Sequence, residues 1–134
     1  ICMEPIGEFY SKAKALEYLA AGYVVIIGGG TSIPYISTDT ASALRGIEIE
    51  AEIVFKGTRV DGIYTADPEK DPTATKYDVI TFDEVLAKRL KEMDQTAFTL
   101  CRENGLGLIV FDMDTPGNLL KVINGEPIGT IVKE

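Results

Sequence analysis

The sequence predicts an α/β fold with a largely parallel sheet, and three short apolar runs support this prediction. They are residues 23–27 (Tyr-Val-Val-Ile-Ile), 53–55 (Ile-Val-Phe) and 108–111 (Leu-Ile-Val-Phe). Each is rich in β-branched or aromatic residues, as strands covered on both faces are. Segments with helical patterns alternate with these runs, which is the order of elements in α/β proteins. The length of 134 residues suits one domain, which we assign to residues 1–134.

Capping residues and apolar spacing define the helices between the runs. We expect helices over residues 11–20, 38–48, 81–90, 94–104 and 115–124. Thr38 or Asp39 is expected to cap the second of these helices, and Thr81 with Glu84 has the spacing of a capping box in the third. The last is expected to begin at Thr115-Pro116, with Pro in its first turn.

Two remaining segments complete the predicted fold. Residues 57–77 are rich in Gly, Pro, Asp and Thr, so we expect a loop or hairpin region there. Residues 129–132 can add an edge strand to the sheet.

The overall charge excludes some classes of partner. A net charge of -8 and a pI near 4.6 argue against a nucleic-acid or anionic membrane surface. There is no histidine, and Cys2 and Cys101 match no metal or redox spacing, so we expect a reduced, cytoplasmic protein without a metal-ligand cluster. Residues 18–38 are uncharged, but Gly and Pro interrupt them, so they read as a strand and a loop rather than a membrane span. The chain begins at Ile1 and enters a helix–strand unit almost at once, so we expect it to be part of a longer protein.

A glycine-rich loop after the first apolar run is the first candidate site. Residues 28–39 (Gly-Gly-Gly-Thr-Ser-Ile-Pro-Tyr-Ile-Ser-Thr-Asp) join the carboxyl end of a predicted strand to a helix, where parallel α/β sheets bind ligands. The glycines permit close backbone approach, and Ser37 and Thr38 place hydroxyl and amide groups at a helix end that favours phosphate. No Gly-Lys-Ser/Thr follows, so this is not a Walker A loop. A tight loop that only connects the strand to the helix, and binds no ligand, explains the spacing of these residues equally well.

The second candidate is residues 56–68 (Lys-Gly-Thr-Arg-Val-Asp-Gly-Ile-Tyr-Thr-Ala-Asp-Pro). Its Asp-Gly pair is a turn signal, and taken alone the segment favours a structural hairpin. It also offers the hydroxyl of Thr58, the aromatic face of Tyr64 and the carboxylate of Asp67, which suit an adenine and a ribose. A third group, Asp94 with Thr96 and Thr99, favours a simple helix N-cap.

Taken together, these segments carry a family resemblance. The matching residues are 30–31, 34–41, 44–49, 56, 60–68, 70–74, 93–94, 97–98 and 110–113. In this order they resemble bacterial UMP kinases of the amino-acid kinase superfamily, over essentially the whole chain. Aspartate kinases share the Val-Asp-Gly-Ile-Tyr-Thr-Ala-Asp-Pro motif, but the Pro-Tyr-Ile-Ser-Thr-Asp loop narrows the resemblance to UMP kinases. The chain corresponds to the C-terminal half, or slightly more, of that family's protein.

The resemblance implies a three-layer α/β sandwich, of which this chain is the C-terminal, nucleotide-binding part, incomplete without the N-terminal half. It also implies a set of site residues. UMP is expected to contact Thr31, Ser32, Ile33, Pro34, Tyr35, Ile36, Ser37 and Thr38. ATP, with its Mg²⁺, is expected near Thr58, Tyr64 and Asp67, and Asp39 is expected to orient lysines at the transferring phosphoryl group. Many members have Gly-Asn in place of Ser32-Ile33, so one polar contact to the nucleotide is absent here.

The implied activity is transfer of the γ-phosphoryl group of ATP to UMP, by a cytoplasmic homo-oligomer that is typically a hexamer. The family's Lys-x-Ser-Gly phosphate loop is not in this sequence, so we expect the chain alone to be inactive. Two alternatives remain. One is an aspartate-type amino-acid kinase, which should lack the Pro-Tyr-Ile-Ser-Thr-Asp loop. The other is a non-catalytic nucleotide-binding or storage protein on the same scaffold.

Overall fold

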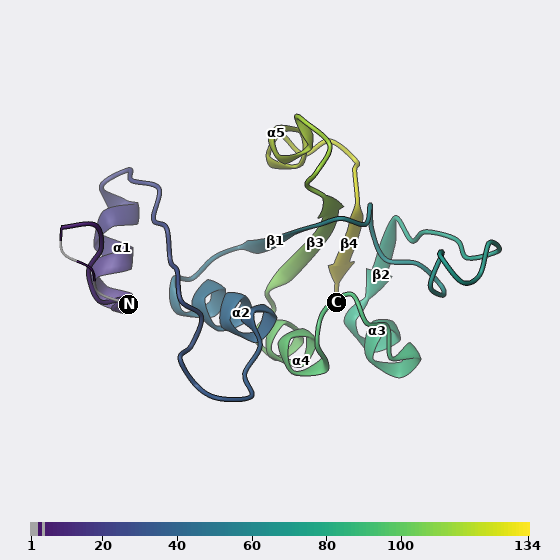
Figure 1. Ribbon diagram of the computed structural model, residues 1–134, viewed down its shortest axis with the longest axis horizontal. Coiled ribbons are helices and arrows are strands. Elements are labelled where there is room, and N and C mark those ends of the chain that lie inside the picture. Colours follow the sequence, from purple (N-terminus) through teal and green to yellow (C-terminus); the bar gives the residue numbers. More distant parts are fainter. Residues whose placement is uncertain (1–2, 4) are drawn as a thin grey trace.

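The computed structural model describes Met3 and residues 5–134, and the described residues form an α/β fold around a four-stranded sheet (Figure 1). The strands are β1 (Ile53–Thr58), β2 (Val79–Thr81), β3 (Gly107–Asp112) and β4 (Thr130–Lys133), in the spatial order β1-β3-β4-β2. β1 pairs with β3 and β2 with β4 in parallel, whereas β3 and β4 are antiparallel. The predicted α/β class with a largely parallel sheet is therefore confirmed.

Three helices cover one face of the sheet. They are α2 (Thr38–Glu48), α3 (Phe82–Lys88) and α4 (Gln95–Glu103), which lie in a row in Figure 1. α5 (Asn118–Ile123) lies on the opposite face, and α1 (Lys12–Ala20) stands apart from the sheet beyond α2. The main hydrophobic core therefore lies between the sheet and the row of three helices.

This core is built by strand alternation. Leu108 and Val110 of β3 and Val132 of β4 are fully buried against the three helices, together with Phe98 of α4. The other face of the sheet is only partly covered by α5. Phe55 and Ile131 of the strands, and Leu120 and Ile123 of α5, remain exposed there.

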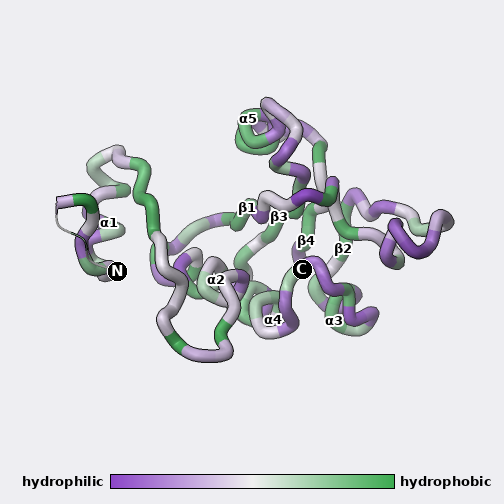
Figure 2. The backbone as a smooth tube through the Cα atoms, viewed as in Figure 1, coloured by the Kyte–Doolittle hydropathy of each residue, from purple (hydrophilic) through white to green (hydrophobic). Residues whose placement is uncertain are grey.

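The prediction of a strand at residues 23–27 is wrong. The segment is extended but pairs with no strand of the described chain, and the side chains of Val24 and Ile26 are 92% and 93% exposed. Figure 2 shows it as a strongly apolar stretch on the path from α1 to α2. A β-branched run sets an extended backbone, but a strand also needs a neighbour to pair its N–H and C=O groups.

Two predictions near the C-terminus are corrected in detail. β4 is not an edge strand: it lies inside the sheet, because Thr130–Val132 pair with β3 on one side and residues 131–133 with β2 on the other. α5 begins at Asn118, with Gly117 as its N-cap in the left-handed region at φ 89°, rather than at Thr115-Pro116. The turn of residues 112–117 takes up the residues assigned to the first helical turn.

Most other local predictions are confirmed. Thr81 and Glu84 form the predicted capping box at the start of α3, and Asp94 caps α4. The predicted loop region contains a short ribbon, in which Ile63–Thr65 pair with Thr75–Tyr77. The turn of this ribbon lies near residues 66–74, not at Asp61-Gly62 as the Asp-Gly signal predicts.

Candidate functional site

The N-termini of α2 and α4 are joined by a shared carboxylate. Asp94 caps α4 by accepting a hydrogen bond from the Ala97 amide at 2.8 Å. The same carboxylate accepts hydrogen bonds from the Ser37 hydroxyl and, at 3.0 Å, from the Thr40 hydroxyl. Burial works against its ionisation, but these donors outweigh burial, so the pKa of Asp94 lies below its usual value. One negative charge therefore fixes where both helices begin.

Ser37, not Thr38 or Asp39, is the N-cap of α2. Its backbone is extended (φ -74°, ψ 164°) and its hydroxyl accepts from the Thr40 amide at 3.0 Å. This corrects the predicted cap, and it has a chemical consequence. Asp39 stands in the first helical turn with its carboxylate free of the capping role.

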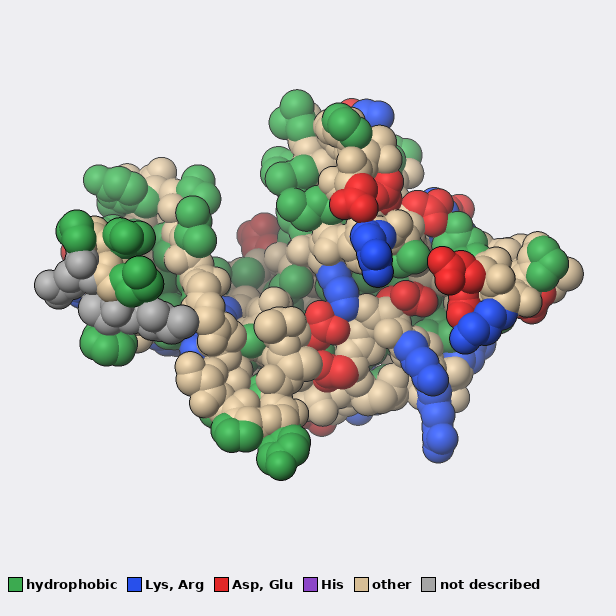
Figure 3. All heavy atoms as spheres, in the orientation of Figure 1, with side chains coloured by type: hydrophobic (Ala, Val, Ile, Leu, Met, Phe, Trp, Pro, Cys, Tyr) green, Lys and Arg blue, Asp and Glu red, His purple; other side chains and the backbone are tan. Residues whose placement is uncertain are grey.

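Asp39 instead forms an ion pair with a lysine from the sheet. Lys56 of β1 places its Nζ 2.8 Å from Asp39 Oδ2, with the two side chains only 21% and 30% exposed. The same ammonium group donates to the backbone carbonyl of Glu92, just before α4. Lys56 is thus held between α2 and α4, on the helix-covered side of β1. Figure 3 shows acidic and basic side chains gathered on this part of the molecule, while apolar side chains dominate around α5 and the N-terminal segment.

Glu92 connects this pair to the second candidate segment. Burial raises the pKa of its carboxyl; Lys56 lowers that pKa and Asp67 raises it. The charges of Lys56 and Asp67 therefore act on the Glu92 carboxyl in opposite directions.

The glycine-rich loop that precedes α2 is largely exposed. We call residues 28–37 the acceptor loop. Ser32 and Tyr35 adopt positive φ values of 58° and 66°, which are uncommon for residues with a side chain, and Tyr35 is fully exposed. Within the loop, the Thr31 hydroxyl accepts from the Ile33 amide at 3.2 Å. The loop is tied to the core at its end, where Ser37 bonds to Asp94.

The residues predicted to lie around ATP sit at the end of β1 and in the ribbon that follows. Thr58 is the last residue of β1. Tyr64 donates its hydroxyl to Asp61 at 2.7 Å, which raises the pKa of the tyrosine. Asp67 accepts from the Glu69 amide and pairs with Lys70, and these contacts lower the pKa of its carboxyl. The ribbon therefore presents an aromatic ring and an ionised carboxylate on one short exposed structure.

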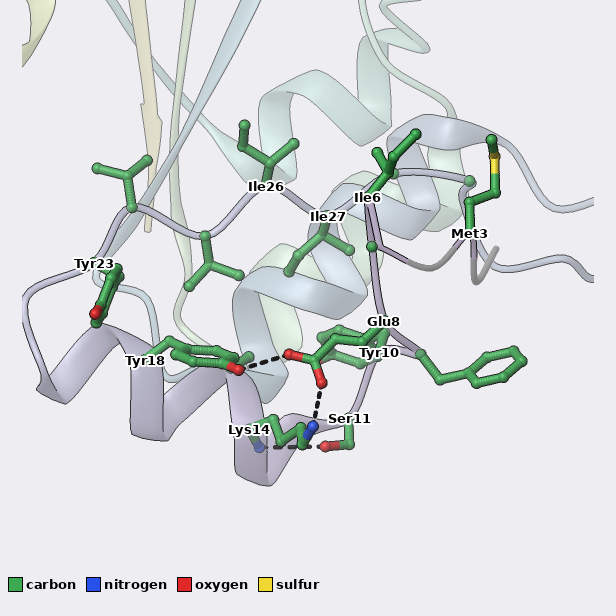
Figure 4. A pocket seen from close by; sticks show the side chains of 17 residues that line it. Met3, Ile6, Glu8, Tyr10, Ser11, Lys14, Tyr18, Tyr23, Ile26 and Ile27 are labelled. Atoms are coloured by element: carbon green, nitrogen blue, oxygen red, sulfur yellow. Dashed lines mark hydrogen bonds and ion pairs between the residues drawn. The ribbon is translucent and has the colours of Figure 1, made fainter.

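A hollow lined by other residues lies elsewhere in the described chain. It encloses about 640 Å³ between the N-terminal segment, α1 and residues 23–29, and apolar side chains such as Ile6 and Ile26 line much of it (Figure 4). Its polar contacts are those of Glu8, which accepts from the Tyr18 hydroxyl at 2.7 Å and from Lys14. None of the predicted site residues lines it.

The structure adds two residues to the candidate site that the sequence motifs do not single out, Lys56 and Thr40. The position of Lys56 directly after an apolar run indicates that its side chain needs a charged or polar partner, because a lysine that points toward the core is rarely left unpaired. The link from Thr40 to Asp94 spans 54 residues and had no local signal.

Among the described residues, no helix is long and apolar enough to cross a membrane. No group of three or more His, Cys, Asp or Glu side chains in the described part of the chain is arranged to hold a metal ion.

Comparison with known proteins finds similar proteins that are named as kinases. The chain is 67% identical over 130 residues to the uridylate kinase of Bacteroides thetaiotaomicron, covering 97% of this chain and 55% of that protein. The uridylate kinase of Parabacteroides distasonis is 66% identical over 132 residues, covering 98% of the chain and 56% of that protein. The chain thus spans about half the length of the curated relatives it matches.

Solved structures agree with this finding. The UMP kinase of Bacillus anthracis superimposes with a TM-score of 0.94 at 33% identity, covering 99% of this chain and 55% of that one. The UMP kinase of Ureaplasma parvum gives a TM-score of 0.91 at 35% identity, covering 100% and 57%. The amino acid kinase family matches residues 8–112, and the chain belongs to that family.

Proposed function

We propose that the complete gene product is a UMP kinase, and that this chain supplies much of its acceptor and nucleotide sites. The observation that carries the proposal is the Asp39–Lys56 ion pair at the N-terminus of α2, directly after the acceptor loop. A fixed cation beside a helix N-terminus suits a phosphoryl group that must be held and neutralised. The named relatives, all uridylate or UMP kinases, support UMP as the acceptor.

The proposed reaction needs no general base from the protein. The second pKa of a phosphate monoester is near 6, so the UMP phosphate is mostly a dianion at pH 7. One of its oxygens forms a bond to the γ-phosphorus of ATP, the bond from that phosphorus to the β,γ-bridging oxygen breaks, and ADP leaves with the electron pair. The products are UDP and ADP. The protein's task is to align two anions and reduce their repulsion.

The site residues divide this task. Residues Thr31–Thr38 are proposed to contact UMP, with the first amides of α2 directed at its phosphate. Lys56 is proposed to contact the transferring phosphoryl group, and Asp39 orients Lys56 through the 2.8 Å pair. Ribbon residues Tyr64 and Asp67, with Thr58, are proposed to surround the adenosine, and Mg²⁺ enters with ATP on its phosphate oxygens.

We also propose that the complete protein acts in the cytoplasm as a homo-oligomer, and a hexamer is the expected assembly. The open face of the sheet beside α5, with Phe55 and Ile131 exposed, supports a further layer of structure over it. Sedimentation of the complete gene product tests the assembly. A monomer at micromolar concentration would contradict it.

A comparison of acceptors tests the function directly. ADP release by the complete gene product is followed in a coupled assay with UMP, CMP, dUMP or aspartate, and a lane without acceptor gives the ATPase background. We expect turnover to be fastest with UMP. Turnover with aspartate and none with UMP would indicate an aspartate-type kinase. ATP binding without turnover of any acceptor would indicate a binding or storage protein.

A further inference from the structure

A buried threonine at the C-terminal end of the chain holds the base of the ATP ribbon. We define the ribbon as residues 63–77. Thr130, the first residue of β4, is fully buried, and its hydroxyl makes two hydrogen bonds to the ribbon's ends. It accepts from the Ile63 amide at 2.8 Å and donates to the Tyr77 carbonyl at 2.5 Å. A hydroxyl has one proton, so the Thr130 hydroxyl donates its single hydrogen bond to the Tyr77 carbonyl.

These contacts lie where the two sides of the ribbon leave the sheet. The Tyr77 amide donates to the Ile63 carbonyl at 2.8 Å, so Ile63 and Tyr77 already face each other. The Thr130 hydroxyl bonds to the backbone groups that this pair leaves over: it accepts from the Ile63 amide and donates to the Tyr77 carbonyl. Past this pair most of the ribbon is exposed and projects away from the sheet (Figure 1). The direction in which it projects is therefore set at its base.

Two glycines leave room for this arrangement. A Cβ at Gly62 would lie 2.4 Å from the Thr130 hydroxyl oxygen, so any larger residue there would displace that oxygen. Gly129 has φ 79°, and a Cβ on it would lie 2.2 Å from the Val110 carbonyl oxygen. The backbone before Thr130 is therefore pressed against β3, which fixes the position of the hydroxyl. Two segments distant in sequence, Gly62 and the adjacent pair Gly129 and Thr130, therefore meet at this contact.

We propose that Thr130 is a positioning residue for ATP, acting through the ribbon without touching the nucleotide. This rests on the proposed function, in which Tyr64 and Asp67 of the ribbon contact the adenosine. Tyr64 follows Ile63 directly, so a shift of the Ile63 backbone moves the aromatic ring with it. Without the hydroxyl, the Ile63 amide and the Tyr77 carbonyl lose a buried partner and the ribbon base opens.

The test compares three variants of the complete gene product. Thr130→Val keeps the shape and removes the hydroxyl, whereas Thr130→Ser keeps the hydroxyl. Val132→Ala is the matched control, because Val132 is also fully buried on the same face of β4 but its side chain has no group that can hydrogen-bond to the ribbon. KM for ATP, KM for UMP and the thermal midpoint are measured for each. Hydrogen exchange of peptides covering residues 63–77 gives a readout that does not depend on activity.

We expect Thr130→Val to raise KM for ATP about tenfold, because one buried hydrogen bond is lost. The same variant should raise KM for UMP less than about twofold. Hydrogen exchange in the ribbon of Thr130→Val should be faster by about tenfold or more. Thr130→Ser should resemble the unmodified protein both in KM and in ribbon exchange. Val132→Ala should lower the thermal midpoint with ATP binding unchanged. If Thr130→Val behaves like Val132→Ala in all readouts, Thr130 is a core residue only and the proposal is wrong. If hydrogen exchange in the ribbon rises in Thr130→Val but KM for ATP does not change, then Thr130 does hold the ribbon, and the proposal that the ribbon contacts ATP is wrong.

Discussion

Replacing Asp39 by Asn separates its chemical role from its structural one. The side chain keeps its shape, and because Ser37 caps α2, the cap is untouched. Two effects remain: the loss of a negative charge in the first turn, worth about 0.3–1 kcal/mol, and the loss of the pair with Lys56. Since the two side chains are 30% and 21% exposed, the pair adds on the order of 1 kcal/mol after solvent screening. The free energy of unfolding should therefore fall by about 1–2 kcal/mol, a few degrees in thermal midpoint.

The effect of Asp39→Asn on catalysis should be larger. Without the carboxylate, Lys56 keeps only the Glu92 carbonyl as a fixed partner and is no longer aimed at the transferring phosphoryl group. We expect kcat of the complete gene product to fall at least about 30-fold, roughly 2 kcal/mol of barrier. Steady-state kinetics with saturating ATP and UMP, and thermal unfolding of the same sample, measure both quantities.

Asp83→Asn is the matched control. Asp83 occupies the same second helical position in α3 as Asp39 does in α2, and it also pairs with a cation, Arg102, at 3.0 Å. It lies outside the proposed site, so kcat should not change. If Asp39→Asn lowers kcat no more than Asp83→Asn does, the Asp39–Lys56 pair is structural. If Asp39→Asn instead unfolds the protein and the activity falls in proportion, its role lies in folding.

Three further predictions follow from the site and the core. Tyr64→Ala and Asp67→Ala should each weaken ATP about tenfold and UMP little, as measured by titration calorimetry; equal losses for both ligands would make the ribbon structural. Because the pKa of Asp94 is lowered in the folded protein, its charge stabilises the fold above its unfolded pKa of about 3.9, and this contribution is lost as the pH falls through the folded value. The difference in urea stability between the unmodified protein and Asp94→Asn should therefore be present at pH 7 and shrink below about pH 4, and a constant difference would contradict this. Burial raises the pKa of the Cys101 thiol to about 11, so in a Cys2→Ser variant it should react with a thiol reagent at pH 8 only after unfolding, and rapid labelling of the native protein would count against the buried placement.

The fold was predictable wherever local pattern and tertiary surroundings agree. Residues 108–111 and residues 23–27 have the same β-branched character, but only the first forms a strand. Its neighbours, β1 and β4, are present to pair with it, whereas the described chain offers residues 23–27 no partner. Sequence gives an extended backbone, and pairing decides whether that backbone becomes a strand. The position of β4 inside the sheet was missed for a related reason, since a four-residue strand carries no signal of how many neighbours it has.

The candidate site is predicted in its segments and not in its connections. Motifs and resemblance point to the acceptor loop, Asp39 and the ribbon, because the residues of each segment are close in sequence. They do not point to Lys56 or Thr130, because the proposed roles of these two residues rest on contacts with residues 17 and 67 positions away. Hydrogen bonds of this range are set by the topology of the sheet, which the motifs do not encode.

The long-range contacts explain how two exposed segments can serve a reaction that tolerates little misplacement. The acceptor loop and the ribbon each have few contacts of their own with the core. Each is held at the point where it joins the core, the loop by Ser37 on Asp94 and the ribbon by Ile63 and Tyr77 on Thr130. Misplacing reacting groups by about 1 Å can cost about a hundredfold in rate. Substitutions of the half-buried Asp94 or the buried Thr130 should therefore impair the proposed reaction although neither residue is proposed to touch a substrate.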